Sequence, residues 1–173
     1  MSKKERQKER LRDIHQDTEG NLIYTGEIYT VTGDVNAFRC RFTAGQVIIL
    51  AMVISSGCID AAGANNSFYV ILPYIGEAIA VFILAWNSVR TIYAADRIRR
   101  YTLDACRTRI PGACRMLAIF AAAGMILSIV YMARNGMGNQ PMKAVMYPVL
   151  KLVTTVAAEI YKKYYNGLEW ELK

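Results

Sequence analysis

The sequence predicts an all-α integral membrane protein built as a bundle of four transmembrane helices. The chain has 173 residues, 54% of them hydrophobic, and the apolar residues are clustered. Four stretches, approximately 42–59, 68–93, 114–133 and 142–161, each contain an apolar run long enough to cross the roughly 30 Å of hydrocarbon in a bilayer. A soluble helical bundle is the alternative, and the lack of any charge between Phe42 and Ile59 argues against it.

The basic residues indicate how the chain is oriented. The formal net charge is +7; eight Lys and Arg residues precede the first stretch, seven lie from Arg90 to Arg115 around the central loop, and three follow the fourth. Because positive residues accumulate on the cytoplasmic side, we expect both termini and the central loop in the cytoplasm, and the plasma (inner) membrane as the location. We expect these residues to contact anionic lipids, and we expect no nucleic acid, because they flank membrane spans and form no aromatic-interleaved module.

Residues 1–41 differ in composition from the rest and are expected to form a cytoplasmic segment. Residues 2–14 alternate basic and acidic side chains, which is typical of a short solvated helix or a disordered basic arm. Residues 17–41 are rich in Ile, Tyr, Thr and Val, and the turn-forming sequence Thr25-Gly26-Glu27 predicts a short β-hairpin, with an irregular linker as the alternative. An isolated hairpin is marginal in water, so it would have to pack on the central loop, another copy or a partner.

The second stretch carries two anomalies for a membrane helix. Pro73 removes a helical hydrogen bond, frees the carbonyl of Tyr69 and predicts a kink, and Glu77 follows one turn later. The helix is expected to continue through Tyr93 into an arginine-rich loop that ends at Pro111-Gly112. The candidate contacts for lipid headgroups are Arg90, Arg97, Arg99, Arg100, Arg107 and Arg109.

The third and fourth stretches complete the expected bundle. The third has small residues at four-residue spacing, Ala118 with Ala122 and Gly124 with Ser128, which favours close contact with neighbouring helices. The fourth contains Pro148, which predicts a second kink, and, near its middle, Lys151. Residues 162–173 follow as a cytoplasmic C-terminal tail.

Glu77 and Lys151 are expected to meet. Each lies ten residues from the outer end of its helix, which is about 15 Å deep and close to the middle of the bilayer. Neither charge would readily remain buried alone, so opposite charges at one depth should be partners. The expected lining of the resulting polar pocket is Tyr69, Glu77, Tyr147, Lys151, Thr154 and Thr155.

Three roles are open for this pair. It can be a structural ion pair that fixes which helices pack together, with ordinary membrane prolines beside it. It can be a site for a proton, an ion or a small solute, because ionisable residues and broken helices often mark pathways through membranes. It can also face the helix of another protein.

The sequence contains no motif that is typical of an enzyme. We find no components of a serine, cysteine or histidine triad and no phosphate loop, so we expect no enzyme. The four cysteines form no C-x-x-C pair and the one histidine is His15, so we expect no metal and no cofactor. The sequence favours a non-enzymatic accessory or assembly subunit, as a homo-oligomer or in a larger membrane complex. The alternative is a small oligomeric transporter or channel that uses Glu77 and Lys151.

Overall fold

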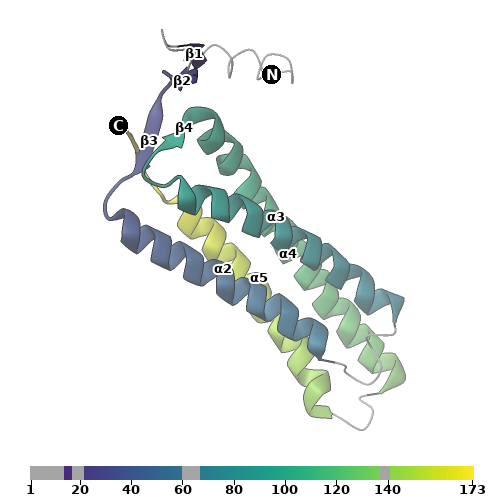
Figure 1. The fold of residues 1–173 in the computed structure, drawn as a ribbon. Helices are drawn as coiled ribbons and strands as arrows, with labels where there is room; N and C mark the ends of the chain where they lie inside the picture. Colours follow the sequence, from purple (N-terminus) through teal and green to yellow (C-terminus); the bar gives the residue numbers. More distant parts are fainter. Residues whose placement is uncertain (1–13, 17–21, 60–66, 137–140) are drawn as a thin grey trace.

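Four long helices form the body of the protein, and they lie side by side in Figure 1. The structure, a computed structural model, describes residues 14–16, 22–59, 67–136 and 141–173. The helices are α2 (Val35–Cys58), α3 (Phe68–Tyr93), α4 (Arg100–Asn135) and α5 (Pro141–Asn166). Each is long and apolar enough to cross a membrane, as predicted. The arm expected over residues 2–14 lies, apart from Ile14, outside the described residues.

The helices bury one apolar face and leave another exposed. Helix α4 packs along both α3 and α5, while α2 contacts α3 and α5. Phe42, Leu84 and Leu117 are fully buried in the core. On the outside, Phe82 is 70% and Ile119 is 66% exposed, among many other large apolar side chains. An outer surface of this kind is unfavourable in water and suits lipid, so the bundle fits a small membrane protein.

Three helices extend beyond the predicted membrane-spanning stretches. Helix α4 begins at Arg100, so most of the predicted central loop is helical and Pro111 lies inside the helix. Proline removes one helical hydrogen bond, but Ile110 and Cys114 near it are fully buried. The packing of that face compensates for the missing hydrogen bond. Helix α2 begins at Val35, seven residues early, because the Asp34 carboxylate caps it by accepting from the Asn36 amide at 2.8 Å. Helix α5 runs five residues past its predicted end at position 161, to residue 166.

Short strands gather at one end of the bundle, which we call the sheet end. Strand β3 (Ile28–Val31) lies between β4 (Ile98–Arg99) and β5 (Trp170–Leu172), antiparallel to both, and β1 (Ile14–Gln16) pairs with β2 (Leu22–Tyr24). The predicted turn at Thr25–Glu27 was wrong, because the strands on its two sides pair with different partners. A three-stranded sheet gives β3 a partner on each edge, which a two-stranded hairpin does not.

The sheet joins three distant segments of the chain to the bundle. Strand β5, from the expected tail, and β3, from the N-terminal region, lie at the same end of the helices (Figure 1). Beneath them the Phe42 ring stacks on those of Phe38 and Tyr161, with centroids 5.1 and 4.7 Å apart, and Trp170 meets Phe38 edge-on. The cytoplasmic location of this end stays a prediction. The opposite end, where α2 ends and α3 begins, is called the loop end.

Candidate functional site

The structure brings the side chains of Glu77 and Lys151 together inside the bundle. The Lys151 ammonium nitrogen Nζ lies 2.8 Å from Oε2 of Glu77, and neither side chain has any exposed surface. Glu77 follows the first residue of α3 by nine positions, and Lys151 follows the first residue of α5 by ten. At a rise of about 1.5 Å per residue, both lie roughly 15 Å from the loop end.

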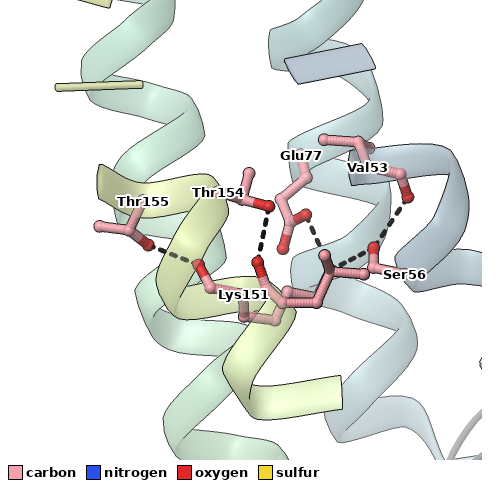
Figure 2. A network of polar contacts seen from close by, with 7 residues as sticks. Val53, Ser56, Glu77, Lys151, Thr154 and Thr155 are labelled. Atoms are coloured by element: carbon pink, nitrogen blue, oxygen red, sulfur yellow. Dashed lines mark hydrogen bonds and ion pairs between the residues drawn. The ribbon is translucent and has the colours of Figure 1, made fainter. Parts of the chain in front are cut away.

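A third helix contributes to the same group of contacts, drawn in Figure 2. Lys151 Nζ donates a second hydrogen bond to Oγ of Ser56 in α2, at 2.9 Å. The Ser56 hydroxyl in turn donates to the carbonyl of Val53 at 2.8 Å. The serine can donate and accept at once because its hydroxyl has one proton and two lone pairs. Lys151 thus links α2, α3 and α5 at one level of the bundle.

Two tyrosine rings face the same ammonium group. Nζ of Lys151 lies 5.1 Å from the ring centroid of Tyr74 and 4.9 Å from that of Tyr147, within the range of a cation–π interaction. Each tyrosine lies about one turn before the charged residue of its own helix, Glu77 or Lys151, and therefore on the same face. Gly57 of α2 leaves room for Tyr74, since a Cβ at that position would approach its hydroxyl far inside contact distance.

Helix α4 closes the site with its backbone. A Cβ added to Gly124 would lie 3.4 Å from Oε1 of Glu77 and 3.7 Å from Cε of Lys151. Oε1 of Glu77 and the hydroxyl of Tyr147 are buried, and neither has a hydrogen-bond partner among the described residues. Buried polar groups are normally satisfied, so these two atoms are available to a ligand.

A cavity lies beside this site, on the side of the loop end. It has a volume of about 190 Å³ and is partly open. It is lined by Ser56, Gly57, Val70, Ile71, Tyr74 and Tyr147. Three of these residues, Ser56 and the two tyrosines, also surround the Lys151 ammonium. The cavity and the charged site therefore share their walls.

The predicted pocket lining was wrong at the Tyr69 side chain, and the threonine hydroxyls lie near the site without a hydrogen bond to the Lys151 ammonium. The Tyr69 side chain is 64% exposed; it lies eight residues before Glu77, about 80° around the helix, and Val70 takes the inward position. The hydroxyls of Thr154 and Thr155 donate to the carbonyls of Leu150 and Lys151, each at 2.9 Å. Such bonds to the preceding turn are usual for threonine in helices, and they direct both hydroxyls to the backbone of α5.

The sequence reasoning missed Ser56, Tyr74 and Gly124 as members of the site. Tyr74 carries a usable signal, because it lies three residues before Glu77 on the same helical face. Ser56 and Gly124 carry none, since their roles depend on how α2 and α4 are rotated against the other helices. Pro73 and Pro148 lie inside α3 and α5, as placed by the sequence.

The candidate lipid contacts lie toward the sheet end, away from this site. Arg97, Arg99, Arg107 and Arg109 are exposed and Arg90 is half-buried. Arg100, also exposed, pairs with Glu27 at 3.1 Å. The binding of these side chains to headgroups stays a prediction.

A second buried polar layer lies nearer the sheet end. The Ser88 hydroxyl of α3 contacts Oε1 of Gln46 at 3.3 Å and the hydroxyl of Tyr161 at 2.9 Å. Ser88 follows Glu77 by eleven residues, or about 16 Å along the helix. Between the two layers lie buried apolar side chains, among them Ile49 and Leu84. The polar interior of the bundle is therefore divided by an apolar layer.

Comparisons with family models, curated proteins and solved structures find no match for this chain. Among the described residues, no group of three or more His, Cys, Asp and Glu side chains is placed to hold a metal ion. The site itself consists of an ammonium held by a carboxylate, a hydroxyl and two aromatic faces.

Proposed function

We propose that this protein is a small membrane transporter subunit that binds a small polar solute at Glu77 and Lys151. The supporting observation is the cavity at the loop end, whose walls include the same Ser56, Tyr74 and Tyr147 that surround the Lys151 ammonium. A pair with a purely structural role would need no cavity beside it. Each ionisable group in the membrane interior costs at least about 2.5–3.5 kcal/mol, and such groups commonly mark binding sites.

The two polar layers suggest how one side could be closed while the other is open. The cavity lies on the loop-end side of the layer at Lys151. The layer around Ser88, nearer the sheet end, is separated from it by the apolar side chains of Ile49 and Leu84. A rearrangement that opened this apolar layer toward the sheet end would complete alternating access. Four helices are few to enclose a path, so we expect a homo-oligomer or a larger complex.

Reconstitution into proteoliposomes tests this function. Labelled ethanolammonium, acetate and glycine represent cationic, anionic and zwitterionic solutes, and protein-free liposomes correct for leakage. We expect uptake of at least one of them to exceed leakage with the wild-type protein and to return to the leakage rate with Glu77→Gln. Tyr69→Leu, a change on the exposed face of the same helix, should leave uptake unchanged. Equal uptake by wild type and Glu77→Gln for all three would refute a transporter role.

An accessory or assembly subunit is the second candidate, and the sheet end favours it. There the chain uses three distant segments to build a small sheet, and two arginines are exposed at it: Arg99 in β4 and Arg97 just before that strand. Such a platform suits the docking of an acidic protein surface. Purification in a mild detergent followed by mass spectrometry should then yield a partner in fixed stoichiometry, which is lost when Arg97 and Arg99 are both changed to Glu.

A further inference from the structure

We propose that the ligand of this site is a primary ammonium ion, which takes the place of the Lys151 ammonium on Glu77 while Lys151 releases a proton. The inference deepens the proposed function and rests on it for the transport step. It begins from the fact that the site already holds an ammonium group, supplied by the chain itself. The surroundings of that group define the chemistry that the site recognises.

Every group around Lys151 Nζ attracts a cation. The Glu77 carboxylate accepts from it at 2.8 Å and the Ser56 hydroxyl at 2.9 Å. The rings of Tyr74 and Tyr147 present faces 5.1 and 4.9 Å away, and aromatic faces carry partial negative charge. An anion entering along these walls would meet the ring faces and the carboxylate. The hydrogen-bond acceptors favour a primary ammonium over a quaternary one, which has no N–H to donate.

The cavity limits the size and polarity of the ligand. Its volume of about 190 Å³ suits a small solute. Val70 and Ile71 provide an apolar wall, which suits a short alkyl chain. The buried Tyr147 hydroxyl, without a partner among the described residues, can bond a second polar atom such as a hydroxyl. Ethanolammonium meets all these requirements.

Charge balance couples binding to proton release. The groups that face Lys151 are Glu77 and Tyr74 from α3, Tyr147 from α5 and Ser56 from α2, while α4 contributes the backbone at Gly124. Among the described residues, Glu77 is thus the carboxylate that faces this ammonium, and one carboxylate neutralises one buried cation.

When the ligand R–NH3+ binds Glu77, one N–H bond of Lys151 therefore breaks. The proton leaves through the cavity, and the lysine remains as a neutral amine that can still donate to Ser56. One positive charge enters the site and one leaves, so the charge of the site is unchanged. Lys151 acts as an internal competitor of the ligand.

Calorimetry on the purified full-length protein tests this exchange. Titration with ethanolammonium chloride in two buffers of different ionisation enthalpy gives the number of protons released. We expect one proton per ligand bound, and a Kd that rises about tenfold for each unit by which the pH is lowered. Tetramethylammonium and acetate at the same ionic strength should bind much more weakly. Binding of ethanolammonium without proton release, or preferential binding of acetate, would overturn the proposal.

Variants separate ligand binding from folding. Lys151→Met removes the competitor, so ethanolammonium should bind at least about tenfold more tightly and release no proton. Because this variant leaves a buried carboxylate and risks unfolding, Tyr74 provides an independent test. Tyr74→Leu removes one ring face and should raise the Kd by about 2- to 30-fold, whereas Tyr74→Phe should stay within about twofold of wild type. Tyr69→Leu is the matched control and should not change the Kd; equal effects of the two leucine changes would contradict the aromatic site.

The outcomes distinguish this inference from the proposed function. If acetate or glycine uptake depends on Glu77 while ethanolammonium fails to bind, the ligand assignment is wrong and transport stands. If ethanolammonium binds with release of one proton but no uptake depends on Glu77, the ligand assignment stands and transport is wrong. Failure of both measurements refutes both.

Discussion

The ion pair in the middle of the bundle and the ion pairs at the sheet end have nearly the same length but opposite surroundings. Lys151 and Glu77 are 2.8 Å apart, and both side chains are completely buried. At the sheet end, Arg39 and Asp96 are 3.0 Å apart, with side chains 36% and 53% exposed. Geometry alone would rank these contacts together. Burial separates them, because it decides what happens when one partner is removed.

The two kinds of ion pair differ in what can stabilise a charge after its partner is removed. An exposed arginine that loses its partner is solvated by water, so such pairs contribute about 0–1 kcal/mol. A buried charge that loses its partner has no such alternative, and the loss costs about 3–5 kcal/mol. At the sheet end, moreover, backbone bonds join the segments, including those from the Arg100 amide to the Glu27 carbonyl and from the Lys173 amide to the Ile28 carbonyl.

The largest expected effect comes from separating the buried pair. Glu77→Gln and Lys151→Met should each lower the free energy of unfolding by about 3–5 kcal/mol, because each leaves its partner buried without a counter-charge. The double variant should recover most of this loss, since no unpaired charge remains. Reversible unfolding in mixed detergent–SDS micelles, followed by circular dichroism, measures all four proteins. Additive losses in the double variant would show that the two residues do not depend on each other.

Ser56 provides the next largest effect within the same region. Ser56→Ala removes the hydroxyl that accepts from Lys151 and should cost about 1.5–3 kcal/mol, the usual range for a hydrogen bond to a charged group. Ser55, its exposed neighbour, is the matched control, and Ser55→Ala should change stability by less than about 0.5 kcal/mol. Equal effects of the two changes in the same unfolding assay would mean that α2 does not contribute to holding Lys151.

The middle of the bundle was more predictable than the sheet end, for a physical reason. Helical rise is fixed, so counting residues from the helix ends places Glu77 and Lys151 at one depth, where their side chains meet. Rotation about the helix axis is set by packing, and it therefore could not be read from the sequence. That is why Tyr69 was assigned to the pocket on the strength of its carbonyl while its side chain faces outward.

The sheet end depends on pairing between segments that are far apart in the sequence. Strand β4 is two residues long within an arginine-rich stretch, and β5 consists of three residues at the end of the chain. Neither has a local pattern that identifies it as a strand. At Pro111-Gly112 a local pattern is present but misleading. The pair is typical of a turn, yet burial of the surrounding helix outweighs the preference of proline for turns.

A smaller effect is expected from the better-connected of the exposed pairs. Arg39 donates to Asp96 and also, through Nε, to the carbonyl of Ile92 at 3.1 Å. Arg39→Ala should therefore cost about 1 kcal/mol, with the share due to Asp96 disappearing in 1 M salt. Asp96→Asn removes only the interaction with Asp96, and it should hardly change the free energy of unfolding at high salt. A loss of about 3 kcal/mol or more would place this pair with the buried one and remove the distinction between the two regions.

The smallest expected effect concerns the titration of a single side chain at the sheet end. The Tyr29 hydroxyl donates to the Glu27 carboxylate at 2.7 Å, and this hydrogen bond, more than any other cause, raises the pKa of Tyr29 above its usual value. Since the folded pKa is raised, the stabilisation is complete below the unfolded pKa near 10 and is lost as the pH rises through the folded value. Glu27→Gln should bring the pKa of Tyr29 back toward about 10 without a measurable change in the unfolding midpoint at pH 7. Carbon NMR of ring-labelled tyrosine, with Tyr29→Phe to assign the signal, follows this titration. An unchanged pKa would show that Glu27 does not bind Tyr29 in solution.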